Sequence, residues 1–200
     1  MPLFPLTYLP SCGVVNRMSE YESVCFDIHE YYVKQTLRNR CYILSPNGPL
    51  ALIIPVMHQD LYRTCMKDVK IANNTPWQRQ HWRSLVNAYN RSPFFEYYRD
   101  DLEPLYSKRW EYLVDFSSAL LNLIIELAGL KMKLNFTGKY FEKYHPDYRN
   151  MTNDNDPGSI PYVQVFTYKF GFSPGLSFAD LLFNCGADGT AYLLNNRRNR

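Results

Sequence analysis

A polar cluster from Gln35 to Arg40 lies directly before an apolar, strand-like run and has the residue types of a binding site. An arginine there could hold a carboxylate or phosphate through its planar donor face, and an asparagine could bind a sugar hydroxyl or an amide. Because ligands of open α/β sheets bind in loops at strand ends, we expect Gln35, Asn39 and Arg40 to bind substrate. Salt bridges on the rim of the sheet are the alternative for Arg38 and Arg40.

Trp77 and His81 form a second candidate group on a predicted helix over 76–89. They lie four residues apart, on the flank of an apolar stripe that comprises Trp82, Leu85, Val86 and Tyr89. A histidine at the border of a core, beside an aromatic ring, is placed as a general base in a cleft would be, so we expect a catalytic role for His81 and substrate binding by Trp77. A structural histidine bound to a backbone carbonyl gives the same pattern, and the sequence leaves both interpretations open.

His29 is the third candidate and ends a strand-like run that includes Asp27. Strand alternation puts both side chains on one face, where the pair could orient a base, so His29 joins the catalytic candidates. No third ligand stands at a diagnostic spacing for a metal, and the sequence has no glycine-rich phosphate loop, Gly-x-Ser-x-Gly elbow or HExxH motif. We therefore predict no metal site, and no particular cofactor is indicated.

The elements that must position these residues alternate between strands and helices. We predict a strand over 24–29 and a β-hairpin of 41–44 and 50–56, because Asn47-Gly48 supplies the positive φ of a tight turn. The second hairpin strand is apolar at nearly every position, which favours a central strand buried on both faces. Further helices are predicted from Ser92-Pro93, over about 104–128 and over 177–186, with a strand at 163–166. The fold class is therefore α/β, a single layered domain with a small mixed sheet, built on the central β-hairpin and packed by several helices.

The length of 200 residues suits one domain, which we expect to span 1–194. Residues 131–160 lose all periodicity and contain a run of turn-forming residues at 153–158, which indicates a flexible loop or flap. Residues 195–200 form a basic tail whose three arginines account for the formal net charge of +3. The remainder of the chain is therefore neutral.

Composition excludes several classes of protein. Hydrophobic residues make up 46% of the chain, yet its longest apolar run is far below the roughly 18 residues of a membrane span, so we expect no membrane span. No basic face indicates nucleic acid as a partner. The five scattered cysteines suit free thiols in a reducing compartment, and residues 1–11 lack the basic start of a signal peptide, so we expect a cytoplasmic protein. The oligomeric state is not indicated.

Several blocks in register resemble the WbqC-like protein family, from about Tyr8 to Gly186. They are Asp27-Ile28-His29-Glu30, the 34–41 segment, Ile54-Pro55-Val56, the 76–95 segment and the 176–186 segment. Members of this family occur in O-antigen gene clusters and have been proposed to transfer glycine to an amino sugar. The resemblance implies a transferase that moves an acyl or aminoacyl (for example glycyl) group onto an amino sugar in surface polysaccharide biosynthesis. Its small-molecule substrates would be the amino sugar and an activated acyl donor.

Two functions therefore stay open, an acyl/aminoacyl-type transferase and a non-catalytic module that binds a small molecule or a protein. In the transferase, His81 takes a proton from the acceptor amine, Arg40 and Asn39 hold an anionic or hydroxylated group, and Trp77 stacks on a ring. In the module, the aromatic segment 94–98 forms an exposed patch. Rings that line a pocket beside Arg40 and His81 would favour the enzyme.

Overall fold

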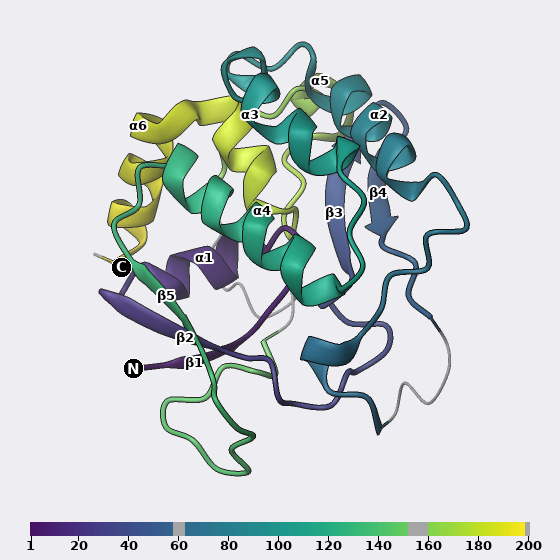
Figure 1. Ribbon diagram of the computed structural model, residues 1–200. Helices are drawn as coiled ribbons and strands as arrows, with labels where there is room; N and C mark the ends of the chain where they lie inside the picture. Colours follow the sequence, from purple (N-terminus) through teal and green to yellow (C-terminus); the bar gives the residue numbers. More distant parts are fainter. Residues whose placement is uncertain (58–62, 152–159, 199–200) are drawn as a thin grey trace.

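Three short parallel strands form one sheet in the computed structural model, which describes residues 1–57, 63–151 and 160–198 (Figure 1). The strands are β1 (Leu3–Pro5), β2 (Ser23–Asp27) and β5 (Lys133–Phe136), in the order β1-β2-β5. The strand predicted at 24–29 is present as β2, the buried middle strand, but it ends at Asp27, so His29 lies in the bend after the strand and does not share a strand face with Asp27. Because all three strands are parallel, their carboxyl ends meet at one edge of the sheet.

The predicted β-hairpin is confirmed as β3 (Arg40–Ser45) and β4 (Gly48–Ile53), an antiparallel pair whose turn ends at Gly48 with a φ of 108°. The pair forms a two-stranded sheet of its own and does not join the parallel strands. Leu50 and Ile53 are consequently exposed, so the expected burial of the second strand on both faces is wrong. In β3 the side chains alternate in burial, which places Arg40 on the face opposite Cys41.

Six α-helices among the described residues pack around these strands, and the α/β fold class is confirmed. The helices are α1 (Cys12–Met18), α2 (Trp77–Tyr89), α3 (Phe95–Ser107), α4 (Leu113–Leu127), α5 (Thr167–Phe170) and α6 (Phe178–Arg198). The chain also forms a 3-10 turn, η2 (Met66–Asp68). None of the helices that the structure describes has the length and apolar content to cross a membrane.

The predicted helix over 104–128 is divided between α3 and α4 by an extended linker. Pro104 lies in the last turns of α3 instead of starting a new helix, and Lys108 ends that helix with an extended backbone at φ −81° and ψ 135°. The α4 helix crosses the front of the molecule in Figure 1 and carries Phe116 into the core. Four rings lie 5.2 to 5.8 Å from that of Phe116, and they belong to Tyr8, Trp77, Tyr106 and Trp110.

The last third of the chain departs most from expectation. No strand forms at 163–166, where a turn leads into α5 instead, and the helix predicted for 177–186 continues to Arg198 after a break at Gly186, whose φ is 68°. The predicted flap contains β5, which pairs with β2. Part of that flap, 152–159, and the end of the predicted basic tail, 199–200, lie outside the described residues.

Candidate functional site

A pocket of about 690 Å³ lies at the edge where the parallel strands end. Five separate stretches of the chain form its wall; one begins at Pro5, the last residue of β1, and another at Val33, in the segment between β2 and β3. This is the position at which open α/β sheets bind ligands. The lining residues are Pro5, Thr7, Val33, Gln35, Thr36, Leu37, Arg38, Arg40, Tyr42, Pro49, Arg149, Asn150, Met151, Pro174, Gly175 and Leu176.

Arg38 lines the pocket but is already paired with Glu30. Arg38 is 6% exposed and Glu30 is 7% exposed. Their contact is bidentate, with Arg38 Nε 2.8 Å from Glu30 Oε1 and Arg38 Nη2 2.6 Å from Glu30 Oε2. Burial raises the pKa of Glu30, although the hydrogen bonds from Arg38 pull it in the opposite direction. The salt bridge that was the alternative interpretation for Arg38 is therefore present, as a buried ion pair.

Asp27, at the end of β2, organises the turn that follows the strand. One of its carboxylate oxygens accepts hydrogen bonds from the backbone N–H groups of His29 and Glu30 and from the Thr137 hydroxyl. The other oxygen lies 2.8 Å from Nη1 of Arg149, a residue of the pocket wall. Asp27 is fully buried, so this carboxylate connects the sheet to the pocket through interactions inside the protein.

Arg149 is held from both sides by carboxylates. Besides Asp27, it contacts Asp147 through Nε and Nη2, and the second of these distances is 2.6 Å. Burial raises the pKa of the Asp147 carboxyl, but the hydrogen bonds from Arg149 outweigh this and hold it below its usual value. Arg149 therefore shapes the wall as a fixed, neutralised group.

Arg40 is the exception among the three arginines of the wall. It has no ion-pair partner among the described residues, and its Nε is buried without a hydrogen-bond partner there. An orphaned buried donor costs about 1–3 kcal/mol, and a bound ligand that accepts its hydrogen bond is one way to offset that cost. The nearby Tyr32 hydroxyl has a pKa of about 12, because burial outweighs the opposing charges of Arg40 and Arg38.

Gln35 lines the same pocket and has a φ of 59°, in the left-handed region that residues other than glycine rarely adopt. Strained backbone of this kind is concentrated at binding and catalytic sites. Gln35 and Arg40 are thus the two predicted substrate-binding residues that the structure brings to the pocket.

Asn39 lies behind the pocket, in the protein interior. It is 6% exposed, and its side-chain amide donates to the Ile54 backbone carbonyl at 2.9 Å. The backbone carbonyl of Asn39 accepts a hydrogen bond from the Ile54 N–H. These bonds attach the start of β3 to the residue that follows β4. Asn39 is absent from the pocket lining, so direct substrate binding by this residue stays a prediction.

His81 and Trp77 are buried together in the core, at 6% and 1% exposure, and neither lines the pocket. The Tyr8 hydroxyl lies 3.1 Å from His81 Nδ1 and also 3.1 Å from the Tyr106 hydroxyl. Burial lowers the pKa of His81 to about 4, against a hydrogen bond with the Ile53 backbone that raises it. The imidazole is therefore neutral at pH 7, and its catalytic role stays a hypothesis without support from this placement.

The buried face of α2 is rotated from the one predicted. The structure buries Trp77, His81, Leu85 and Tyr89, while Trp82 and Val86 are only half-buried. The indole of Trp82 instead stacks on Tyr106 of α3 at 5.6 Å and its N–H donates to Glu103. Because α2 packs on both α3 and the hairpin, two contacts compete for its apolar face, and periodicity alone does not separate them.

His29 lies half-buried at the carboxyl end of the parallel sheet. Its Nδ1 is 3.2 Å from the Thr137 hydroxyl, and its backbone N–H donates to Asp27. The side chain is absent from the pocket lining, yet it shares Asp27 with Arg149, which belongs to the wall. Its predicted catalytic role stays a prediction.

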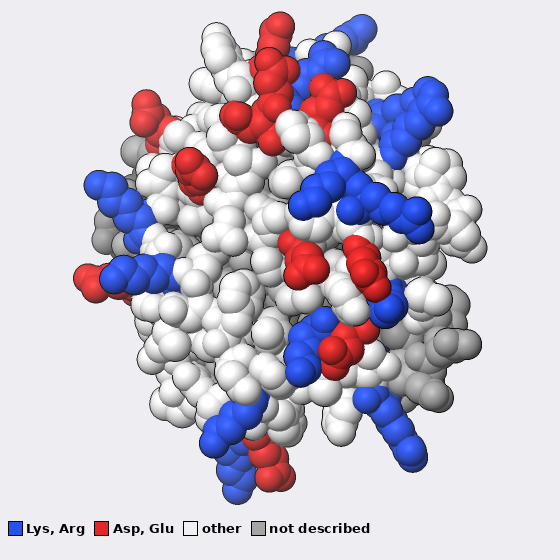
Figure 2. Space-filling model, in the orientation of Figure 1, with Lys and Arg blue, Asp and Glu red and all other residues white. Residues whose placement is uncertain are grey.

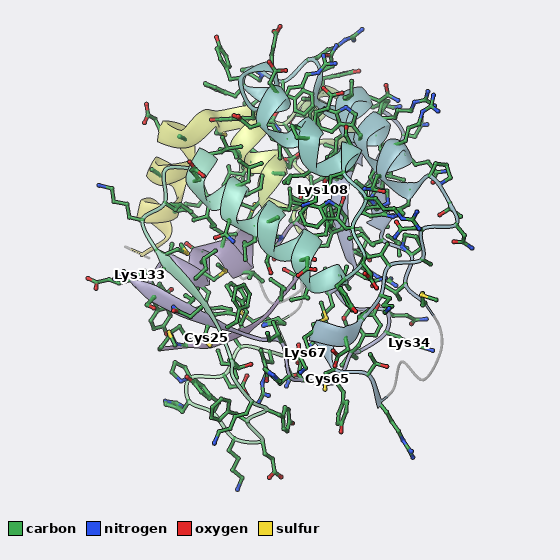
Figure 3. All side chains as sticks on the ribbon, in the orientation of Figure 1. Cys25, Lys34, Cys65, Lys67, Lys108 and Lys133 are labelled. Atoms are coloured by element: carbon green, nitrogen blue, oxygen red, sulfur yellow. The ribbon has the colours of Figure 1, made fainter. Side chains whose placement is uncertain are left out.

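The part of the chain that the structure describes contains neither a cluster of metal ligands nor a disulfide. No group of three or more histidine, cysteine or carboxylate side chains that could hold a metal occurs there. Cys25 and Cys65, labelled in Figure 3, belong to β2 and to the turn before η2, and none of the five cysteines forms a disulfide. On the face drawn in Figure 2, acidic and basic side chains are interspersed, so that face has no field of one sign.

The aromatic segment 94–98 does not form a flat exposed patch. Phe95 is 1% exposed and its ring contacts that of Phe183 at 5.1 Å, while Tyr98 is half-buried beside the same ring. Of the aromatic residues in this segment, only Tyr97, at 77%, is largely exposed. The feature expected of a protein-binding module is therefore absent from this segment, and Tyr42 supplies the aromatic ring of the pocket itself.

Comparison with known proteins places this fold in a family. The model of the WbqC-like protein family matches residues 6–151, more than half of the chain. The chain belongs to the WbqC-like protein family. A relative from Mycobacterium tuberculosis (strain ATCC 25618 / H37Rv), named uncharacterized protein Rv1507c, is 25% identical over 218 residues, which cover 93% of this chain and 94% of the relative. No solved structure gives a significant match.

The WbqC-like match covers most of the pocket, from Thr7 to Met151, but leaves out Pro5 and the wall segment 174–176. The sequence pattern indicates Gln35, Arg38 and Arg40 but not Arg149, which lies in the predicted flap. The signal for Arg149 was its place beside Asp147 in a polar loop, and nothing local indicated that the loop returns to β1. The contact that brings it there is the backbone pairing of Leu3 with residues 146–148.

Proposed function

We propose that this WbqC-like protein binds a small polar molecule with an anionic group in the pocket at the edge of the parallel sheet. Arg40 supports this proposal most strongly, since it is the wall arginine for which the described residues supply neither a carboxylate partner nor an acceptor for Nε. Arg40 is partly buried, and a bound anion would give its guanidinium both a counter-charge and hydrogen bonds.

The reaction that suits the family resemblance is transfer of an acyl or aminoacyl group onto an amino sugar in surface polysaccharide biosynthesis. The acceptor nitrogen would form an amide bond with the acyl carbon of an activated donor such as a thioester. The carbon–sulfur bond would break, the sulfur would leave with the electron pair, and a base would take the proton of the amine. His29 is the better candidate for this base, since it is half-exposed at the sheet edge whereas His81 is buried.

A second candidate function, a non-catalytic small-molecule-binding protein, is favoured by the composition of the wall. The described lining residues include no histidine, cysteine, aspartate or glutamate. General acid–base or nucleophilic catalysis inside the pocket would therefore depend on the substrate or on a group outside the lining.

Both candidate functions require a small anion to bind in the pocket, and ligand retention tests this binding. Native mass spectrometry of the wild-type protein is expected to show a bound small anion that Arg40→Gln loses and Arg91→Gln keeps, because Arg91 is exposed and does not line the pocket. Equal retention by both variants would rule out the proposed site. Incubation with a glycyl thioester and glucosamine then separates enzyme from module, since only the transferase forms the amide product, and His29→Ala should slow its formation.

A further inference from the structure

The guanidinium groups of the pocket differ in how many of their nitrogens are already bonded. All three nitrogens of Arg38 have protein acceptors: Nε and Nη2 bind Glu30, and Nη1 lies 3.3 Å from the Thr36 hydroxyl. Nη2 also lies 3.5 Å from the Arg149 carbonyl. Arg38 is therefore committed to the wall.

Arg149 is committed in the same way. Its Nε lies 3.0 Å from Asp147 Oδ1, its Nη2 lies 2.6 Å from Asp147 Oδ2, and its Nη1 lies 2.8 Å from Asp27 Oδ2. Among the described residues that line the wall or pair with it, three carboxylates thus stand against three arginines, so these charged groups balance. A ligand anion adds its full charge to this balanced set.

The backbone N–H groups at the start of the nearest helix, α6, do not add anion-binding donors to the pocket. Phosphate sites commonly use the free N–H groups of a helix N-terminus. At the start of α6, next to the wall segment 174–176, the N–H of Ser177 donates to the Tyr42 carbonyl and that of Phe178 to the Pro10 carbonyl. These donors are occupied within the protein.

We propose that the pocket selects a singly charged carboxylate, as in a sugar acid, over a phosphomonoester or a pyrophosphate. This inference rests on the proposed function and narrows its ligand class. One guanidinium offers two parallel N–H groups that match the two oxygens of a carboxylate. A phosphate dianion would place twice the charge and a third oxygen beside Arg40 alone, with three carboxylates nearby, and its desolvation would be compensated less.

Two matched pairs of probes test this preference by isothermal titration calorimetry at pH 7.5. Glucuronate and glucose 6-phosphate share a sugar ring and differ in the anion, while acetate and inorganic phosphate remove the dependence on the sugar. We expect the carboxylate of at least one pair to bind about 10-fold or more tightly than its phosphate. Arg40→Gln should abolish this binding, and Arg91→Gln, with the same charge change on an exposed residue, should preserve it.

Asp147→Asn provides a charge variant of nearly the same shape, in which Arg149 keeps its contact with Asp27. Asp147 is only partly buried, and asparagine retains a carbonyl oxygen for the N–H groups of Arg149 while removing one negative charge. The preference for carboxylate over phosphate should then fall several-fold. An unchanged or larger preference would contradict the role assigned to local charge.

The titrations distinguish a failure of the selectivity inference from a failure of the proposed function. If phosphates bind more tightly than carboxylates and Arg40→Gln abolishes their binding, the pocket is an anion site and the selectivity inference is overturned. If no probe binds to the wild-type protein, or binding is unaffected by Arg40→Gln, the proposed function fails together with the inference.

Discussion

The pocket and the buried network around His81 are built from neighbouring residues of the same strands and loops, yet they differ in how their polar groups are satisfied. Thr7 lines the pocket while the next residue, Tyr8, enters the core, and Arg40 and Cys41 divide in the same way. In the core network the hydroxyls and the imidazole bond to one another, whereas the pocket has a guanidinium, that of Arg40, whose Nε finds no acceptor among the described residues. A polar residue inside a protein therefore indicates a ligand site only when its bonds are incomplete.

The largest expected effect concerns Trp77 as a core residue. Trp77→Ala should lower the free energy of unfolding by about 4 kcal/mol, because it removes a fully buried indole that packs edge-on against Phe116. Urea denaturation measures this loss. Trp77→Phe should recover much of the stability and keep ligand affinity unchanged. A loss of affinity at normal stability in Trp77→Phe would move Trp77 to the ligand site.

The pH dependence of stability should come largely from His81. Its pKa is about 4 in the folded protein and about 6.5 in the unfolded chain, so below pH 6.5 the unfolded chain takes up the proton first. The free energy of unfolding should therefore fall by about 3 kcal/mol as the pH drops from 7 to 4. In His81→Gln this contribution should disappear, and an identical pH profile in both proteins would refute the assignment.

Arg38→Gln and Arg40→Gln should change the free energy of unfolding by different amounts. Arg38→Gln leaves Glu30 buried without its partner and should lower the free energy of unfolding by about 3 kcal/mol. Arg40→Gln breaks no ion pair among the described residues and should change it by less than about 1 kcal/mol. Thermal and urea unfolding of the two variants compare them directly, and similar losses would mean that Arg40 is also a structural residue.

A modest gain in stability is expected from a substitution at Gln35. Gln35→Gly relieves the left-handed backbone and should raise the free energy of unfolding by about 1 kcal/mol, while ligand affinity falls with the loss of the side chain. Gln35→Ala keeps the Cβ atom and serves as the control, with reduced affinity and no gain in stability. If the glycine variant binds as well as wild type, the strain at position 35 has no part in binding.

Local patterns in the sequence are sufficient to predict several of the secondary-structure elements and two residues of the pocket. The hairpin follows from Asn47-Gly48, the strand β2 from its apolar alternation, and α2 from Pro76 and the periodic residues after it. Gln35 and Arg40 were found because polar residues before a strand lie at the end of a sheet.

The ion pairs of the pocket wall and the burial of His81 depend on contacts between segments that local sequence patterns do not reveal. Glu30 gives no local sign of its pairing with Arg38 eight residues later, and Arg149 reaches Asp27 across 122 positions of the chain. The burial of His81 depends on which face of α2 meets α3 and the hairpin, a choice made by packing. Such pairings decide which arginines are neutralised, and therefore which one can bind a ligand.

The most direct test of the pocket is the NMR signal of the arginine Nε–H groups in ¹⁵N-labelled protein, assigned with Arg40→Gln. Addition of glucuronate should shift the Arg40 resonance, because its guanidinium would gain an acceptor, and leave Arg38 and Arg149 in place, because theirs are already bonded. Shifts at Arg38 or Arg149 with an unmoved Arg40 would contradict the account.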